Sequence, residues 1–382
     1  MRHLRLADRV LLRKYGDSYF AYHAEKDELF ELDLEAFNFL LSCDGGLKEV
    51  DRSIVEYLLS ENLLEISSER KDNTWSEQEE PSLRYMLVTL TNRCNLTCLH
   101  CYVSQKNEFM SFETFRKAVD DFWKIGGLKL MISGGEPVMH PEFFEFLRYA
   151  RKYPFRIVLL SNGYMIRDEH ISLLSELVDE VQISLDGFEG HEILRRADWR
   201  IVLDRIAKLS EVMDVSVSTM VTRYNINEFE RMQRILENLG ILRWSIDVPT
   251  AERDVVPEWD VVREILSNYG FGEMGHESIQ GYACGAHYCE VNPDGYVVKC
   301  GFFEESVGNV MEGLESCWER MKEKFVWKVE ELECHCNHRE ECRGGCRYRA
   351  LVYSGNLFLE DPVMCAVFGV KTSDVNSGHL NT

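Results

Sequence analysis

The stretch that decides the fold is Cys94-Asn95-Leu96-Thr97-Cys98-Leu99-His100-Cys101, a C-x3-C-x2-C run directly behind an apolar β-type segment at residues 85–91. Three thiolates this close together can wrap one cubane iron–sulfur cluster and ligate three of its irons. The fourth iron then has no protein ligand, and such an open position distinguishes a catalytic metal centre from a closed structural one. The alternatives are a zinc site with His100 as fourth ligand, or three unrelated thiols. Zinc is disfavoured because its usual signature is paired C-x2-C spacing.

The composition is that of a globular protein, with 45% hydrophobic and 28% charged residues in 382. A net charge of −22 argues against bulk binding to nucleic acid or to an anionic membrane surface. No apolar run approaches the length of a membrane span, and the first residues lack the apolar region of a secretory signal, so we expect a cytoplasmic protein. Thirteen cysteines in such a chain indicate metal or redox chemistry, and nine of them lie after residue 280.

Residues 1–70 are predicted to form a small α+β unit. Strand-like segments precede two helical patterns and a closing apolar segment, at 10–13, 19–22, 28–32, 34–41, 54–59 and 63–66. Glu28–Leu32 alternates polar and apolar residues, and we expect it to be an exposed sheet edge. An extended peptide can add to such an edge as a further strand, with the following helix as the other wall. Residues 67–82 are polar and lack periodicity, so a linker is assigned to residues 71–83.

The middle of the chain repeats a strand and a helix six times. The predicted strands lie at 85–91, 128–133, 156–161, 180–185, 215–222 and 242–248, with amphipathic helical runs such as 112–125, 143–153 and 229–239 between them. This alternation predicts an α/β core with parallel strands and right-handed crossovers over residues 84–250. Active sites of such barrels lie on loops at the C-terminal ends of the strands, where the cysteine run is placed.

The cysteine run, the six strand–helix units and the segment Ile132-Ser133-Gly134-Gly135-Glu136-Pro137 resemble the radical S-adenosylmethionine (SAM) superfamily. In that family the three-cysteine cluster binds SAM at its open iron and reduces it. The resulting 5′-deoxyadenosyl radical then abstracts a hydrogen from the substrate. The resemblance implies a partial (β/α)6 barrel. His100 is a mild departure, because the family usually has an aromatic residue before the third cysteine.

The resemblance also implies which residues contact SAM. The segment that resembles the family's GGEP motif would receive the methionyl amine, with glycines that permit close backbone approach and a Glu136 that either pairs with the amine or braces the loop. Further contacts are implied at the ends of the third and fourth strands, and the full set is Gly134, Gly135, Glu136, Pro137, Ser161, Asn162, Ser184 and Asp186. Asp186 has a second interpretation, as a brace for its own turn. His191 and Arg195 either face the substrate or lie on a solvated helix face.

The cysteine-rich tail resembles the SPASM extension of radical SAM enzymes, which holds two auxiliary [4Fe–4S] clusters. The matching spacings are Cys284-x10-Gly295-x4-Cys300 and Cys336-x5-Cys342-x3-Cys346, with a distant Cys365. We assign residues 281–382 to this extension and 251–280 to a bridging region. The family's interleaved pattern implies one cluster on Cys284, Cys289, Cys300 and Cys346, and a second on Cys334 or Cys336, Cys342 and Cys365. The C-x-C pair departs from the family's C-x2-C, and a zinc ribbon is the alternative here. Cys43 and Cys317 remain as ordinary buried thiols.

The N-terminal unit resembles the PqqD-like RiPP recognition element, which grips the leader of a ribosomally made precursor peptide; a mere N-terminal cap is its alternative. The whole chain thus resembles peptide-modifying radical SAM–SPASM maturases, which form thioether or carbon–carbon cross-links. The resemblance implies SAM, three [4Fe–4S] clusters, a precursor peptide and a flavodoxin- or ferredoxin-type electron donor. No catalytic acid or base is nominated from the sequence.

Three other functions stay open at this point. A sulfatase-maturing enzyme is disfavoured because Gly301 stands where those relatives carry an aspartate. A small-molecule oxidoreductase of a heme or quinone pathway is the second. The third is a non-catalytic, metal-bound scaffold that binds a peptide.

Overall fold

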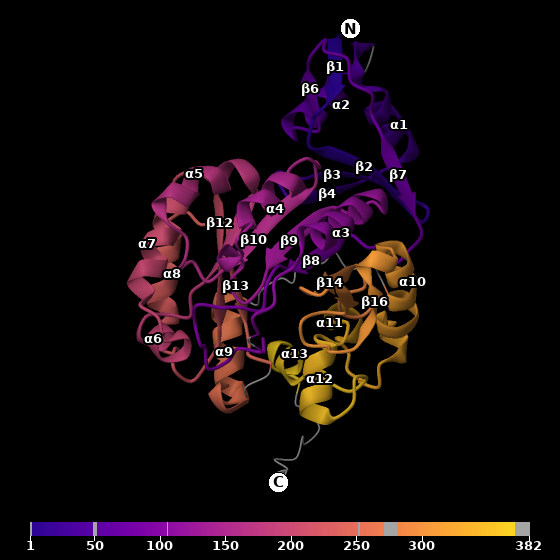
Figure 1. Ribbon diagram of the computed structural model, residues 1–382. Helices are drawn as coiled ribbons and strands as arrows, with labels where there is room; N and C mark the ends of the chain where they lie inside the picture. The colour runs from indigo at the N-terminus through magenta and orange to yellow at the C-terminus, as the bar shows by residue number, and fades with distance from the viewer. Residues whose placement is uncertain (1, 49–51, 105, 251–252, 271–280, 371–382) are drawn as a thin grey trace.

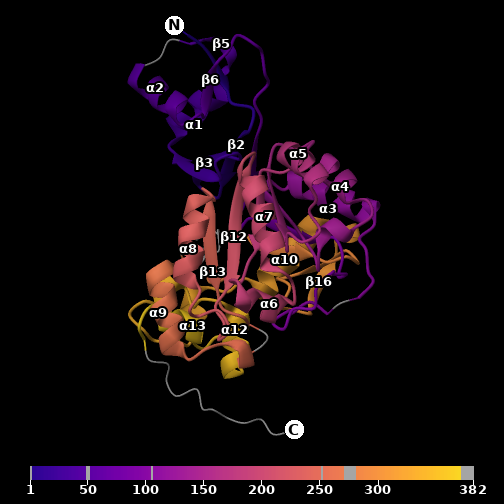
Figure 2. The ribbon, with the colours of Figure 1, turned by 90° about the vertical axis from the view of Figure 1, so that its left-hand side faces the viewer.

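The computed structural model describes residues 2–48, 52–104, 106–250, 253–270 and 281–370. An N-terminal unit, a central barrel and a C-terminal cysteine-rich unit follow one another along the chain (Figures 1 and 2). The N-terminal unit has a hydrophobic core of its own, whereas the barrel and the C-terminal unit share one large core. Within the described ranges, no helix is both long and apolar enough to cross a membrane.

The N-terminal unit contains two sheets and two helices. One sheet has the order β5-β1-β6, and the other has the order β4-β3-β2-β7. The predicted strands and helices are present, and β4 lies at the edge of its sheet as predicted. The bounds are β1 Arg2–Leu6, β2 Val10–Tyr15, β3 Ser18–His23, β4 Glu28–Leu32, α1 Leu34–Ser42, β5 Asp44–Lys48, α2 Arg52–Ser60, β6 Leu64–Ile66 and β7 Trp75–Gln78.

The linker assigned to residues 71–83 is wrong in its middle, where β7 forms. Leu12 pairs with Trp75 and Tyr15 with Gln78 in a parallel ladder. The Trp75 ring packs edge-on against Phe37, with ring centroids 5.6 Å apart. β7 is an edge strand with alternately exposed residues, so its sequence is polar enough to look like a linker.

The six expected parallel strands form the barrel. They are β8 Tyr85–Thr89, β9 Lys129–Ser133, β10 Arg156–Ser161, β11 Glu180–Ser184, β12 Asp214–Met220 and β13 Arg243–Asp247, neighbours in that order. The helices on its outer side are α3 Phe112–Lys124, α4 Phe143–Ala150, α5 Asp168–Leu177, α6 Glu189–Arg195, α7 Trp199–Ser210 and α8 Phe229–Asn238 (Figure 1).

The two faces of the barrel strands differ in chemistry. Outward residues such as Val88, Leu130 and Val217 are fully buried under the helices. Inward residues line the cavities, and they include the polar residues Ser133, Gln182, Ser184, Ser218 and Ser245 as well as the larger Tyr85, Leu87, Met131 and Leu160. Closed barrels fill their interior with branched apolar side chains. Here the inner face leaves a lumen.

The C-terminal unit continues the barrel sheet. β14 Tyr288–Val291 pairs in parallel with β8, and β15 Tyr296–Val298 and β16 Ser306–Asn309 extend the sheet further. β14 and β15 are antiparallel, so the turn over residues 292–295 closes a hairpin. In the bridging region, α9 Trp259–Tyr269 packs on the last helix, and residues 271–280 lie outside the described residues. The helices of the tail are α10 Leu314–Phe325, α11 Arg339–Cys342, α12 Arg347–Ser354 and α13 Pro362–Val367.

Hydrogen bonds from a buried arginine and one ion pair fix the N-terminal unit to the barrel. Arg156 donates to the carbonyl oxygens of Ala24 and Glu25, at 3.1 and 2.7 Å, and to Glu180 at 2.8 Å. Lys129 pairs with Asp27 at 2.5 Å. Because Lys129, Arg156 and Glu180 begin their strands, the N-terminal unit contacts the end of the barrel opposite the cysteine run.

We predict that Arg156→Ala lowers the free energy of unfolding by about 3–5 kcal/mol, since it leaves the buried Glu180 carboxylate without this partner. The matched control is R148A, because Arg148 is an exposed residue of α4, with an expected change within about 0.5 kcal/mol. Urea unfolding followed by tryptophan fluorescence compares the two variants. Equal midpoints would contradict the docking role.

Candidate active site

The cysteine run forms a loop at the C-terminal end of β8. Leu99 N–H donates to the Leu194 carbonyl at 2.7 Å, which ties the loop to α6, and Cys101 N–H donates to the Cys98 carbonyl at 3.3 Å. Cys94, Cys98 and Cys101 all line one cavity of about 250 Å³. The predicted convergence of the three thiols on one site is therefore present, and we call this space the SAM-side cavity.

Burial raises the pKa of two of the three thiols. The pKa of Cys98 is raised to about 11 by burial, with smaller raising contributions from Cys101 and Cys94. Burial likewise raises the pKa of Cys94. A metal or cluster must displace these protons to bind, so uptake depends on pH.

Gly134 and Gly135 line the same cavity and pack against the cysteine loop. A β-carbon on Gly134 would lie 2.6 Å from the Thr91 carbonyl oxygen, and one on Gly135 would lie 2.6 Å from that of Arg93. The backbone is bonded there as well, since Gly135 N–H donates to Thr91 O at 2.8 Å. The glycines are thus required by the approach of two protein segments as well as by space for a ligand.

Glu136 braces the loop, which was one of its two predicted roles. It is fully buried, and it accepts hydrogen bonds from Ser161 Oγ at 2.9 Å and from Asn162 N–H at 2.8 Å. It does not line the cavity, and neither does Pro137, which is buried at the start of a 3-10 helix. The bracing role predicted for Glu136 fits this packing, and the contact of Glu136 or Pro137 with SAM stays a prediction.

The polar residues at the ends of β10 and β11 divide into two groups. Ser161, Asn162 and Ser184 line the SAM-side cavity as predicted. The Asn162 side chain donates to Asn95 Oδ1 at 2.9 Å and to Cys94 Sγ at 3.8 Å, which connects β10 to the cysteine loop. Asp186 is fully buried outside the cavity lining, so its role as a brace is the one that the structure supports.

Asp186 holds an arginine at the cavity wall. Arg195 Nε donates to Asp186 at 2.6 Å, and His100 Nε2 lies 3.6 Å from the same carboxylate. Burial alone would raise the pKa of Asp186, but Arg195, His100 and His191 together hold it below its usual range. Arg195 lines the cavity, whereas His191 is buried behind Asp186 with Nδ1 3.2 Å from the Asp186 N–H. Neither lies on a solvated helix face.

Several cavity residues are absent from the predicted set. They come from inward positions of the strands and from the end of β13, namely Ser133, Leu160, Gln182, Ser218, Met220, Asp247 and Thr250. The alternation of inward and outward side chains along each predicted strand is the sequence signal that could have identified the inward residues.

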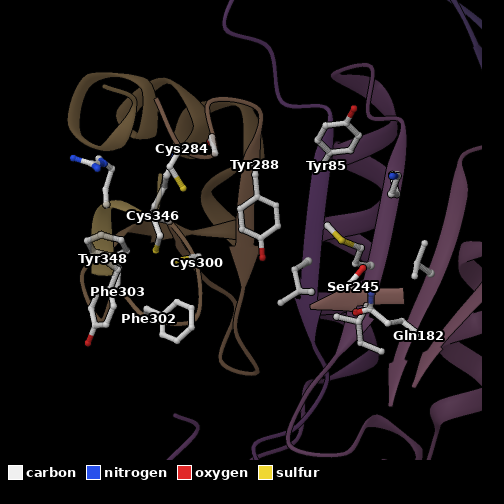
Figure 3. A pocket seen from close by; sticks show the side chains of 18 of the residues that line it. Tyr85, Gln182, Ser245, Cys284, Tyr288, Cys300, Phe302, Phe303, Cys346 and Tyr348 are labelled. Carbon is white, nitrogen blue, oxygen red and sulfur yellow. Dashed lines mark hydrogen bonds between the residues drawn. The ribbon is translucent and has the colours of Figure 1, made fainter. Parts of the chain in front are cut away.

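A second cavity, of about 340 Å³, lies deeper in the lumen and faces the C-terminal unit. It shares Leu160, Gln182 and Phe302 with the SAM-side cavity. Figure 3 shows barrel residues Tyr85, Gln182 and Ser245 on one side, with Cys284, Cys300 and Cys346 on the other. Its charged lining is entirely basic among the described residues: Lys129, Arg243, Lys299 and Arg347. We call it the inner cavity.

The predicted ligand set of the first auxiliary cluster is only partly assembled. Cys284, Cys300 and Cys346 line the inner cavity, and Cys284 and Cys346 are hydrogen bonded to each other. Cys289 does not line it and is fully buried in the large core. Its assignment as a ligand in this group is contradicted, because it lies on the other face of β14.

The second group of cysteines gathers around Cys342, and its role as a cluster ligand set stays a prediction. Burial raises the pKa of Cys342, and the nearby Cys336 and Cys334 thiols raise it further. Burial also raises the pKa of the Cys365 thiol, and the nearby Cys342 and Cys336 contribute to this rise. Both members of the C-x-C pair therefore lie near Cys342. Cys43 and Cys317 are fully buried, as predicted.

The surroundings of Arg347 indicate whether anionic clusters would fit the two cysteine groups of the C-terminal unit. It is 1% exposed, and its Nε and Nη2 have no hydrogen-bond partner in the structure. Its charge lowers the pKa of Cys284, Cys334 and Cys342, so it lies between the groups. Within the described ranges, no three His, Cys, Asp or Glu side chains converge tightly enough to hold a single metal ion. Spaced thiols around a buried cation fit cubane clusters.

The family comparison agrees with this geometry. Residues 88–266 match the family model of the radical SAM superfamily. The chain contains a radical SAM domain. The domain includes the cysteine loop, both glycines and every strand end that lines the SAM-side cavity.

This chain is similar in sequence to heme synthases and to a mycofactocin maturase. It is 25% identical over 343 residues to the AdoMet-dependent heme synthase of Oleidesulfovibrio alaskensis, covering 75% of this chain and 88% of that one. It is 26% identical over 301 residues to the mycofactocin maturase MftC of Mycobacterium ulcerans, covering 67% and 81%. The solved structure of Streptococcus suis SuiB bound to its precursor peptide SuiA has a TM-score of 0.70 at 15% identity, covering 94% and 99%. That likeness is one of fold.

The brace at Glu136 predicts a pH effect in this radical SAM domain. Burial raises its pKa from 4.5 to about 7. The folded protein thus holds the Glu136 proton more tightly than the unfolded chain does. This difference stabilises the folded state fully below pH 4.5, and the stabilisation is lost as the pH rises through about 7. We expect Glu136→Gln to reduce the change of the free energy of unfolding with pH between 4.5 and about 7. E145Q, at an exposed position of α4, should leave the slope unchanged. If the free energy of unfolding varied with pH in the same way for E136Q and for the parent protein, the raised pKa of Glu136 would be contradicted.

Proposed function

We propose that this protein is a radical SAM enzyme that modifies a ribosomally made peptide at an unactivated C–H bond. The observation that carries the proposal is the lumen itself. The SAM-side cavity adjoins the inner cavity through Leu160, Gln182 and Phe302. The two cavities therefore share a wall inside the barrel, with the three-cysteine loop beside one and the cysteines of the C-terminal unit beside the other.

The residues that would hold the cofactors lie at these cavities. Cys94, Cys98 and Cys101 would ligate the SAM cluster, and Gly134, Gly135, Ser161, Asn162 and Ser184 would contact SAM. When bound, cluster and SAM supply a 5′-deoxyadenosyl radical. The cysteines of the C-terminal unit would hold two auxiliary clusters, although one set differs from the family pattern.

The chain's own residues position the reactants and exclude solvent. Arg195 is fixed by Asp186 and offers a cation at the wall of the SAM-side cavity, suited to a carboxylate. Aromatic rings close the junction between the cavities, with Tyr102 and Phe302 ring centroids 4.5 Å apart and Phe302 and Tyr348 5.2 Å apart.

The N-terminal unit is proposed to bind the leader of the peptide. β4 has an open edge, and Leu34, the first residue of the following helix, is 53% exposed. Backbone pairing on that edge would supply affinity, and side-chain pockets would supply specificity. The precursor peptide in the SuiB structure and the maturase relative support a peptide substrate. A thioether or carbon–carbon cross-link, a flavodoxin- or ferredoxin-type donor and a cytoplasmic location belong to the same proposal.

A small-molecule function has one observation in its favour, namely the likeness to heme synthases over most of the chain. The basic lining of the inner cavity would also accept a carboxylate-bearing small molecule. A sulfatase-maturing function is opposed by packing. A β-carbon at Gly301 would lie 2.7 Å from the Tyr102 ring and 3.1 Å from Glu290 Oε2, so an aspartate there would require the Tyr102 side chain to shift.

We expect the reduced, reconstituted protein to convert SAM to 5′-deoxyadenosine, and Cys98→Ala to abolish this conversion by removing one of three cluster ligands. The measurement is anaerobic turnover followed by liquid chromatography and mass spectrometry. Cys317→Ala is the matched control, because that thiol is buried away from both cavities. Absence of 5′-deoxyadenosine from the parent protein would favour the scaffold function.

The leader-binding proposal predicts that Leu34→Asp abolishes modification of a leader-bearing peptide yet leaves uncoupled SAM cleavage intact. I66D is the control, since Ile66 is 64% exposed on the other sheet of the same unit. Peptide mass shifts and 5′-deoxyadenosine are measured in the same reactions. Unchanged modification by L34D would refute docking beside β4. Turnover of a porphyrin carboxylate, with no peptide mass change, would favour the small-molecule function.

A further inference from the structure

The inner cavity ends on a layer of charged side chains at the start of the barrel strands. In each of β9–β13, a residue that lines a cavity is preceded, two positions earlier, by a charged or polar residue. Side chains two positions apart on a strand lie on the same face, so these residues also point inward. They are Lys129, Arg156, Glu180, Ser216 and Arg243. We call them the floor layer.

Glu180 connects the members of the floor layer. Its Oε2 accepts a hydrogen bond from Arg156 at 2.8 Å, and its Oε1 accepts from Arg243 Nη2 at 3.1 Å and from Ser216 Oγ at 2.5 Å. Burial alone would raise the pKa of Glu180. The hydrogen bonds from Arg156 and Ser216, together with the charge of Arg243, hold that pKa below its usual range. Glu180 is therefore an anion at neutral pH.

The second carboxylate beside the floor layer comes from the N-terminal unit. Asp27 immediately precedes β4, accepts a hydrogen bond from Tyr22 at 2.7 Å and pairs with Lys129 at 2.5 Å. Its Oδ2 lies 3.8 Å from Arg156 Nε. Among the described residues, the three cations Lys129, Arg156 and Arg243 thus face two carboxylates. One positive charge is left over, and a buried charge is costly unless it has a partner.

Two of the three cations reach the inner cavity. Lys129 and Arg243 line it, whereas Arg156 is 1% exposed and does not. The Arg243 side chain is 37% exposed, and its Nη2 is the nitrogen that contacts Glu180. A guanidinium carries five N–H donors in a planar fork that matches a carboxylate. Arg243 therefore has donors to offer to a ligand in the cavity.

Holding Glu180 does not by itself require Arg243. Glu180 is fully buried, and Arg156 and Ser216 already donate to its two oxygens. Arg243 lies at the start of β13, which is the last strand at its edge of the barrel sheet. Its half-exposed side chain is consistent with a role toward the cavity as well as toward Glu180.

Above the floor layer, the inner cavity is mainly apolar. Its barrel side includes Leu87, Met131 and Val158. Figure 3 shows the aromatic rings of the C-terminal unit on the opposite side, namely Phe302, Phe303 and Tyr348. At its other end the cavity shares Leu160, Gln182 and Phe302 with the SAM-side cavity. The ligand that fits this lining has an apolar or aromatic body with an anionic group at one end.

We propose that the inner cavity binds an apolar or aromatic group that ends in a carboxylate, with the carboxylate on Arg243 and Lys129. The assignment of this carboxylate to a peptide rests on the proposed function, because a free carboxylic acid presents the same chemistry. Binding balances the surplus charge of the floor layer and holds the apolar body beneath the junction with the SAM-side cavity. It is a binding step in which no covalent bond forms or breaks.

The test measures binding to the full-length, anaerobically reconstituted protein, with SAM present and no reductant. The probes are N-acetylphenylalanine and its neutral amide, and their affinities are compared by isothermal titration calorimetry. We expect the acid to bind about tenfold more tightly than the amide, as hydrogen bonds to a charged group imply. Equal affinities of the two probes would overturn the proposal without the need for any variant.

Arg243→Gln then locates the carboxylate. We expect R243Q to lose the preference for the acid and to keep the affinity for the amide, whereas R243K should retain part of the preference. R234Q is the matched control, since Arg234 is 67% exposed on α8 and its loss removes the same charge outside the cavity. If R243Q with native circular dichroism kept the full preference, the carboxylate would lie elsewhere, for instance at Arg195, and the proposal would be wrong.

A third probe distinguishes the two sources of the carboxylate. The probe 3-phenylpropionate has the same ring and carboxylate as N-acetylphenylalanine but lacks the acetylamino group. Tighter binding of N-acetylphenylalanine assigns the carboxylate to a peptide, and tighter binding of 3-phenylpropionate assigns it to a free acid; both results support the carboxylate site. These measurements need neither SAM cleavage nor a leader peptide, so the site can be present even if the proposed peptide modification fails.

Discussion

The barrel depends on the strict alternation of side chains along its parallel strands. Each strand sends apolar residues outward beneath the helices, and its inward residues line the lumen. The outward residues supply the burial that stabilises the barrel. The inward residues combine serines and Gln182 with larger side chains such as Tyr85 and Met131, and together they leave cavities. The same alternation creates the lumen, places serines and Gln182 on its wall, and turns Cys289 away from it.

A second constraint is the close packing of loops at the C-terminal ends of the strands. Gly134 and Gly135 allow the loop after β9 to touch the cysteine loop. Glu136 then connects that loop to Ser161 and Asn162, and Asn162 reaches Cys94. Three successive strands thus position the first thiol through a continuous chain of contacts. Arg195 is positioned in the same way by the buried Asp186.

Much of this arrangement follows from the sequence alone. Local sequence patterns predict the cysteine site, the six strand–helix units and the edge position of β4. It is harder to predict the roles of Glu136, Pro137 and Asp186 from the sequence. A motif does not say which of its side chains face the ligand and which face the protein. β7 was missed since an edge strand with one solvated face is as polar as a linker. Cys289 was misassigned because spacing counts cysteines, whereas the face of a strand decides which of them meet.

The central claim is that iron–sulfur clusters, one of them on Cys94, Cys98 and Cys101, occupy sites beside the two cavities of the barrel. The most direct test is the iron and zinc content of the anaerobically reconstituted full-length chain, compared with a variant in which these three cysteines are alanine. The account predicts about twelve irons, falling to about eight in the variant, as cysteine-ligated four-iron clusters require. Zinc in place of iron, or an iron content that the substitutions leave unchanged, would contradict it.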